Sequence, residues 1–253
     1  MKKLIYQYSN PTLDIANKSI QSISTYSKLI KADHIVYDKN IVINNVSPGN
    51  YWGIFYPFLY DLELLLKYDK ICYIDTDVLA TTHLNDIFTN EGYILGCHNY
   101  ASMHRNLDTE MHDAYLHFDT SHSSFSDYDK TILNSLTNIA KYNSRGINSG
   151  VVLFDKHIIK YFSEWLYDNL PYLLNIEDNN PILWRELGKY DQTIINIFIG
   201  ENPKNMGNLN AIFNWRLNRC EYSNRWIATL IHYIIKINKH YLLEDYPNDR
   251  ILK

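Results

Sequence analysis

The 253-residue sequence lacks the features that mark several protein classes. It has only three cysteines, Cys72, Cys97 and Cys220, which lie far apart and form no CxxC pair, so we interpret them as free thiols in a reducing compartment. No stretch approaches the roughly 20 consecutive apolar residues of a transmembrane helix. The segment 1–10 begins like a signal peptide, but polar residues soon interrupt its apolar run. We therefore expect a cytoplasmic protein with no transmembrane segment.

Strong positive charge is also missing. The formal net charge is −4, and the lysines and arginines are scattered without a basic run. A nucleic-acid-binding protein normally shows a basic patch or stripe, so we expect no nucleic-acid partner. What remains is an ordinary folded composition, with 46% apolar and 21% charged residues.

The chain is long enough for one large α/β domain or two small ones. It contains no internal repeat and no linker with a shift in composition. We therefore expect a single domain over residues 1–253, with an irregular insert at about 101–143.

Apolar runs and helical patterns alternate in the first part of the chain. Strand patterns are expected at 3–8, 34–38 and 70–75, with helical patterns at 10–33 and 51–68 between them; Asn10 and Pro11 are start signals for the first helix, and Pro57 should start or kink the second. This alternation predicts an α/β fold with a mostly parallel central sheet flanked by helices. Further strands are expected at 92–100 and 146–156 and further helices at 128–142, 158–174 and 190–200, and the segment 231–239 should close the ordered part of the chain.

Two carboxylates follow the third expected strand. In the segment "KICYIDTDVLA", Asp75 and Asp77 come directly after an apolar run, at the end of a parallel strand where α/β proteins bind ligands. Residues two apart on a strand face the same way, so both carboxylates can reach one point. Such a pair suits Mg²⁺ or Mn²⁺ bound together with substrate phosphates. A DxD tripeptide also occurs by chance in exposed turns.

Two enzyme classes place DxD at a strand end. In phosphatases of the haloacid-dehalogenase type the pair lies on the first strand, and a second acidic cluster follows downstream. Here the pair follows about the third strand, and no later acidic pair follows an apolar strand. The pattern therefore favours the second class, the nucleotide-sugar glycosyltransferases, in which the pair holds a metal on the diphosphate.

Five segments resemble, in order, the motifs of glycosyltransferase family 8, the family of glycogenin and of bacterial lipopolysaccharide galactosyltransferases. "YDKICYIDTDVLA" resembles its "YDRVLYLDADVLV", "INSGVVLFDK" its "FNSGVMLINLKKW", and "YDQTIINIF" its "DQDILN". "LNAIFNWRLN" is similar to its "LPLRFNWN", and "IHYIIKINK" stands in the place of "IIHFTGKPKPW". The matches cover roughly residues 3 to 240.

This resemblance implies a single GT-A (Rossmann-like) domain. It also implies a metal-dependent transfer of a sugar from a nucleotide diphosphate sugar, with a UDP-sugar expected, to a glycan, a protein-linked sugar or another hydroxyl acceptor. The resemblance implies that the anomeric configuration is retained. Because no carboxylate stands out as a covalent nucleophile, we expect the acceptor hydroxyl to attack from the face that the diphosphate leaves. Asp75, Asp77 and His232 would be the ligands of Mn²⁺ or Mg²⁺.

The resemblance also assigns donor contacts. Tyr8 and Ser9, after the first strand, would lie at the base, with Tyr8 stacking on uracil, and Asp75 with its neighbour Thr76 would face the nucleotide. Residues of the two later motifs would surround the donor sugar: Asn148, Ser149 and Gly150 would line its pocket, Asp191 would bind its hydroxyls, and Gln192 would lie beneath the anomeric carbon.

The sequence departs from the family pattern in two places. Ile235 and Asn238 stand where the C-terminal motif has Gly and Lys, so we expect Lys236, or else Lys239, to contact the phosphate. The helix before DxD carries no cation in the segment 56–60, and Arg145 is one candidate to replace it.

Plainer interpretations remain for single residues. His232 in an apolar run can be a core residue, Asp191 can cap a helix, and Asn148 with Gly150 can shape a strand-edge turn. Two rival functions also remain. A nucleotidyltransferase shares the sheet and a metal-bound diphosphate, but it normally carries a Gly-rich basic loop that "YSNPTLD" does not match. A catalytically inactive glycan-binding relative would keep the fold without turnover.

Overall fold

The structure is a computed structural model that describes residues 1–9, 14–39, 41–42, 50–98, 147–179, 191–202, 206–217, 222–233 and 239–253. Its elements follow one another in the order β1 (Lys3–Tyr8), α1 (Asp14–Leu29), β2 (Asp33–Tyr37), η1 (Asn50–Phe55), α2 (Tyr56–Tyr60), α3 (Leu62–Leu65), β3 (Lys70–Ile74), β4 (Val78–Ala80), η2 (Ile87–Thr89), β5 (Ile94–His98), β6 (Ile147–Asp155), α6 (Lys156–Asn179), α8 (Asp191–Glu201), β7 (Met206–Asn208), η4 (Ala211–Phe213), β8 (Trp215–Arg216), η5 (Tyr222–Ile227), β9 (Leu230–His232) and α9 (Lys239–Asp245).

The central sheet confirms the predicted α/β class. Its strand order is β2-β1-β3-β6-β5-β7. The pairs β1–β2, β1–β3 and β5–β7 are parallel, whereas β6 runs antiparallel to both β3 and β5. The sheet is therefore mostly parallel, with one reversed strand at its centre.

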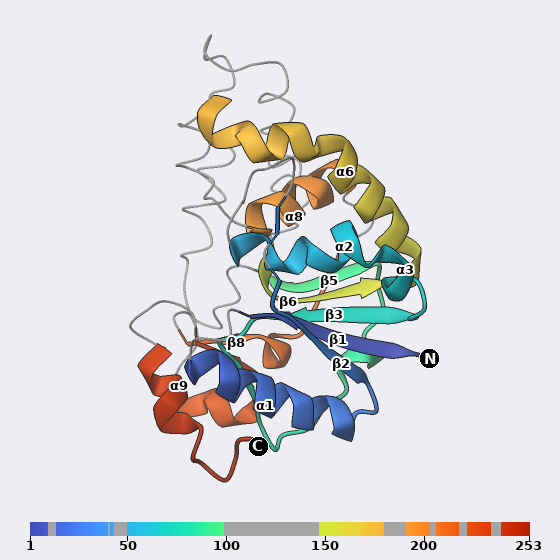
Figure 1. Cartoon of the computed structure of the whole chain (residues 1–253). Coiled ribbons are helices and arrows are strands. Elements are labelled where there is room, and N and C mark those ends of the chain that lie inside the picture. The colour runs from blue at the N-terminus through green and yellow to red at the C-terminus, as the bar shows by residue number, and fades with distance from the viewer. Residues whose placement is uncertain are drawn as a thin grey trace.

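Helices cover both faces of this sheet (Figure 1). Helix α1 lies on one face, and α2, α3, α6 and α8 lie on the other. The alternation of side chains along each strand divides the core accordingly. On β1 and β3, one face buries Leu4, Tyr6, Ile71 and Tyr73 in a cluster with the α2 and α6 side, while Ile5, Cys72 and Ile74 belong to the cluster that packs on α1.

A second, smaller sheet of order β4-β9-β8 was not expected from the sequence. Strand β4 follows β3 after a three-residue turn and pairs antiparallel with β9, so that Val78 lies opposite His232. The small sheet joins the chain just after the DxD tripeptide to the C-terminal motif more than 150 residues later. It therefore brings two distant predicted motifs together.

The structure corrects two expected elements. The stretch 51–68 does not form one helix: it consists of η1, α2 and α3, and α2 begins beside Pro57 as expected. The segment 231–239 does not close the ordered part of the chain. After β9, helix α9 is held by a buried ion pair in which Asp245 accepts hydrogen bonds of 2.8 and 2.9 Å from Arg225. The expected insert 101–143, the helix 128–142 and the start signals Asn10 and Pro11 lie outside the described residues.

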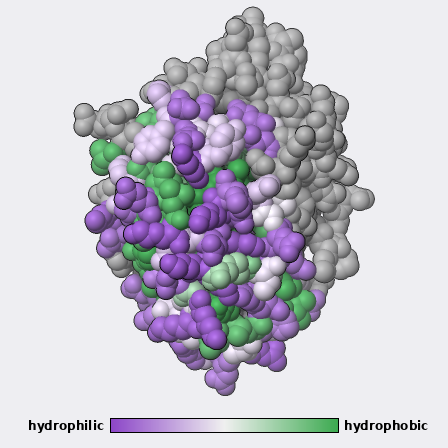
Figure 2. Space-filling model, turned by 90° about the vertical axis from the view of Figure 1, so that its right-hand side faces the viewer, coloured by the Kyte–Doolittle hydropathy of each residue, from purple (hydrophilic) through white to green (hydrophobic). Residues whose placement is uncertain are grey.

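Within the described residues, no helix is both long enough and apolar enough to cross a bilayer. Figure 2 shows the face at which β1 and β3 begin: among the described residues, polar side chains predominate, and apolar side chains appear in separate areas between them.

Candidate active site

The DxD tripeptide lies in the turn between β3 and β4, and not on a continuous strand. Strand β3 ends at Ile74 and β4 begins at Val78, so strand alternation is not what aligns the two carboxylates. The turn is fixed by backbone hydrogen bonds on both sides. The N–H of Asp75 donates to the carbonyl of Gly150 at 2.9 Å, and the carbonyl of Asp77 accepts from the N–H of Tyr233 at 3.0 Å.

Two buried side chains also donate hydrogen bonds to the backbone of this turn. The amide Nε2 of Gln7, on β1, donates to the carbonyl of Asp75 at 3.2 Å, and the hydroxyl of Ser19, on α1, donates to the carbonyl of Val78 at 2.7 Å. Gln7 and Ser19 are fully buried. The turn therefore has little freedom to move its carboxylates away from the end of the sheet.

Asp75, Asp77 and His232 form a cluster that can hold a metal ion, with one ligand atom of each within 4.8 Å of the others. Nε2 of His232 lies 3.1 Å from Oδ1 of Asp77 and 3.6 Å from Oδ2 of Asp75. His232 is buried, and the two aspartates are partly exposed, as a site that opens toward a ligand requires. Two carboxylates and an imidazole suit Mn²⁺ or Mg²⁺, so the residues present fit the implied ion.

Tyr73 orients one of the carboxylates. Its hydroxyl donates a 2.6 Å hydrogen bond to Oδ1 of Asp75. Burial, followed by the nearby charge of Asp75, raises the pKa of Tyr73 well above its usual value, so the hydroxyl keeps its proton and remains a donor. The sequence argument missed Tyr73, because its part depends on a hydrogen bond to another side chain.

The residues predicted for the donor sugar lie next to this cluster. Asn148, Ser149 and Gly150 begin β6, and Asp191 and Gln192 begin α8. Nδ2 of Asn148 donates to Oε1 of Gln192 at 2.9 Å, which links the two elements. Gly150 packs against the imidazole so closely that a methyl group there would lie 1.9 Å from Cε1 of His232.

Asp191 is buried in a position that disfavours its charge. Burial and, to a lesser extent, the charge of Asp75 raise the pKa of Asp191 to about 8, while hydrogen bonds from the Gln192 N–H and the Ser149 hydroxyl oppose the shift. Its Oδ1 accepts the N–H of the next residue, Gln192, at 2.8 Å within the first turn of α8.

The two residues predicted to contact the nucleotide base, Tyr8 and Ser9, differ in whether their side chains are already engaged by the protein. Tyr8 is 7% exposed, its ring packs against Gly53, and its hydroxyl donates to the carbonyl of Lys39 at 2.9 Å, so little of the ring is accessible for stacking. Ser9 is buried, and its hydroxyl has no hydrogen-bond partner among the described residues.

Thr76, the other predicted nucleotide contact, lies half-buried in the DxD turn. Lys236 and Arg145 lie outside the described residues.

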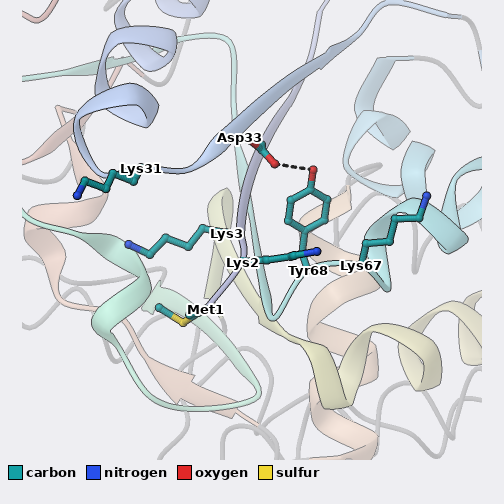
Figure 3. A pocket seen from close by; sticks show the side chains of 7 residues that line it. All are labelled: Met1, Lys2, Lys3, Lys31, Asp33, Lys67 and Tyr68. Atoms are coloured by element: carbon teal, nitrogen blue, oxygen red, sulfur yellow. Dashed lines mark hydrogen bonds between the residues drawn. The ribbon is translucent and has the colours of Figure 1, made fainter.

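A second group of charged side chains lies at the opposite end of β1. A hollow of about 350 Å³ is lined by Met1, Lys2, Lys3, Lys31, Asp33, Lys67 and Tyr68. Figure 3 shows Lys31 and Lys67 directed away from each other, and Asp33 bonded to Tyr68. The Lys3 ammonium group is already paired with Asp86 at 2.5 Å. The lysines do not converge on one point, so the hollow is not built as an anion site.

No protein-family model and no curated protein match the sequence. Solved structures do match. A crystal structure of a glycosyltransferase involved in the glycosylation of the major capsid of PBCV-1 aligns with a TM-score of 0.60 and 10% identity, over 96% of this chain and 100% of that chain.

Two further structures are more distant. The apo form of the glycosyltransferase GlyE of Streptococcus pneumoniae TIGR4 aligns with a TM-score of 0.47 and 12% identity, over 98% of this chain and 61% of that chain. Mouse xyloside xylosyltransferase 1 aligns with a TM-score of 0.45 and 12% identity, over 91% and 96%. The likeness to the first of the three structures shows that this chain has a fold found in a glycosyltransferase.

Proposed function

We propose that this protein is a metal-dependent glycosyltransferase that moves a sugar from a nucleotide diphosphate sugar, a UDP-sugar, to a hydroxyl of a glycan or protein-linked acceptor. The observation that carries the proposal is the convergence of Asp75, Asp77 and His232 at one end of a glycosyltransferase-like sheet. His232 lies more than 150 residues after the two aspartates in the sequence, and a chance acidic turn would not bring a buried imidazole to them.

Each part of the site has a chemical task in this proposal. Asp75, Asp77 and His232 would hold Mn²⁺ or Mg²⁺, and such an ion neutralises charge on a departing diphosphate. Ser9, whose buried hydroxyl has no partner among the described residues, offers a hydrogen bond to the nucleoside. The predicted phosphate contact of Lys236 is kept as part of the proposal.

The sugar would lie between β6 and α8. Asn148, Asp191 and Gln192 offer amide and carboxyl groups to its hydroxyls, and these groups are tied to one another and to backbone. Groups fixed in this way lose little freedom on binding and hold the anomeric carbon in one orientation. We propose that the acceptor hydroxyl attacks from the face that the diphosphate leaves, with a diphosphate oxygen taking its proton, so that the configuration is retained.

The experiment is a turnover assay with UDP-glucose, UDP-galactose, UDP-N-acetylglucosamine and UDP-xylose, each with Mn²⁺, with Mg²⁺ and with chelator. The proposal expects metal-dependent release of UDP from one donor, by transfer or by slow hydrolysis, and loss of that release in Asp77→Asn. NMR of the product would show the retained anomer, and an inverted anomer would refute the proposed attack.

The two rival functions give different outcomes. A nucleotidyltransferase would instead release pyrophosphate from a nucleoside triphosphate and a sugar phosphate. An inactive glycan-binding relative would release no UDP from any donor, with or without metal.

A further inference from the structure

Four buried polar groups beside the metal cluster form one chain of hydrogen bonds. The backbone N–H of Gly150 donates to Oδ1 of Asn148 at 3.1 Å, and Nδ2 of Asn214 donates to the same oxygen at 2.9 Å. Oδ1 of Asn214 lies 2.9 Å from Nδ1 of His232. Asn148, Asn214 and His232 are all less than 9% exposed. Asn214 lies between η4 and β8, and the pairing of β8 with β9 holds it beside His232.

The donor and the acceptor of every hydrogen bond in this network follow from its first group, the backbone N–H of Gly150. A backbone N–H can only donate, so the atom of Asn148 that faces Gly150 must be the oxygen. That oxygen is also the partner of Asn214, so Asn214 must present its NH₂ group there and its own oxygen toward His232. An amide oxygen can only accept, and therefore Nδ1 of His232 must carry a proton.

We infer that Asn214 is a positioning residue that fixes the Nδ1–H tautomer of His232 and thereby aims an unprotonated Nε2 at Asp75 and Asp77. Nε2 is the ring atom that faces both carboxylates, and only an unprotonated nitrogen can bind a metal ion. A lone pair directed at two carboxylates is favourable only with a cation between them. The inference rests on the proposed function through the metal site alone.

The same network also fixes the orientation of the amide groups on the donor-sugar side of the site. Because Oδ1 of Asn148 faces Gly150 and Asn214, its NH₂ group faces Gln192 and bonds Oε1 of that residue. The carbonyl end of Gln192 is thus engaged by the protein, and its amide NH₂ is the end that would face the sugar. One backbone N–H therefore sets the orientation of both the metal side and the sugar side of the site.

The first test is a calorimetric Mn²⁺ titration of the whole chain. Asn214→Leu keeps the shape of the side chain and removes both hydrogen bonds, so Mn²⁺ affinity should fall about 10-fold or more, as is typical when the partner of a ligating histidine is lost. Asn214→Asp keeps an acceptor for the Nδ1–H but loses the NH₂ that donates to Asn148, so its affinity should fall clearly less than that of Asn214→Leu. A purely packing role would weaken both variants alike and would overturn the inference.

Asn202 provides a matched control. Its side chain also donates one hydrogen bond and accepts one, but at the other end of α8, where it bonds the carbonyl of Phe198 and the hydroxyl of Tyr161. Asn202→Leu should leave Mn²⁺ affinity unchanged. Wild-type affinity in Asn214→Leu would contradict the inference.

The second test does not depend on metal binding or on any variant at position 214. Nitrogen-15 NMR of histidine-labelled, metal-free protein distinguishes the two neutral tautomers, and a His232→Gln variant identifies the signal of His232 among the ten histidines. The expected result is a protonated Nδ1, as the acceptor Oδ1 of Asn214 requires, and an unprotonated Nδ1 would overturn the inference. If the wild type bound no Mn²⁺, the proposed function would fail at its metal site while this measurement still decided the role of Asn214.

Discussion

The two ends of β3 carry charged residues in different ways. At the amino end, lysine side chains surround a hollow, but Lys31 and Lys67 point away from each other and Lys3 is paired with Asp86. At the carboxyl end, Asp75 and Asp77 converge with a buried imidazole and belong to a directed network of hydrogen bonds. A functional site is therefore recognised by convergence and orientation, and the number of charges in a region is a poor guide to it.

The largest expected effect on the carboxyl end of the sheet comes from adding a single methyl group. In Gly150→Ala the new Cβ would lie 1.9 Å from Cε1 of His232, so the imidazole must leave its place beside the carboxylates. We expect Mn²⁺ affinity to fall by about 100-fold, at the upper end of what losing the support of a metal ligand costs. Calorimetric titration measures it.

Gly207→Ala is the matched control, because the nearest atom to its new Cβ is the movable tip of Leu95. This variant should bind Mn²⁺ like the wild type. Equal affinities for Gly150→Ala and the wild type would show that His232 is not a ligand.

A smaller effect should appear in the pH dependence of stability. The pKa of Asp191 is about 8 in the native protein and 3.8, its ordinary value, in the unfolded chain. Between these two pH values the native carboxyl keeps a proton that the unfolded chain has lost. The stability of the metal-free protein therefore falls as pH rises through this range. Asp191→Asn removes this penalty. The difference in melting temperature between the variant and the wild type should therefore rise by a few °C, in favour of the variant, between about pH 5 and pH 9. Parallel melting curves across that range would contradict the assignment.

The smallest effect is expected at the amino end of the sheet. Replacing Lys31 and Lys67 together by serine should leave the affinity for UDP with Mn²⁺ within about twofold of the wild type, because these ammonium groups do not converge. Isothermal titration decides this. A loss of about 10-fold or more would mean that the hollow takes part in donor binding.

The sequence predicted the parts of the fold that repeat a periodic signal. The run "KLIYQY" was expected as a strand and is β1, and residues 146–156 were expected as a strand and contain β6. The small sheet β4-β9-β8 was missed because its strands are two or three residues long, and such short strands give no period to detect. Yet this sheet is what brings His232 to the DxD turn.

In the candidate site, too, some residues could be predicted from the sequence and others could not. Residues with distinctive chemistry, such as Asp75, Asp77 and His232, could be named from motif order, and they lie together in the structure. Asn214 and Tyr73 could not be named, because their part depends on a hydrogen bond to another side chain. Asparagine and tyrosine are common in this chain, and nothing in their local sequence separates a positioning residue from a surface one.

The measurement that tests the central claim most directly is a titration of UDP into the wild type, Asp77→Asn and Asp69→Asn, each with and without Mn²⁺. Asp69 lies just before β3 and Asp77 just after it, so the two variants make the same change at its two ends. We predict that the wild type and Asp69→Asn bind UDP only with Mn²⁺, and that Asp77→Asn loses at least about 10-fold in affinity. UDP binding that ignores the metal, or that survives in Asp77→Asn, would contradict a metal-held nucleotide at the carboxyl end of the sheet.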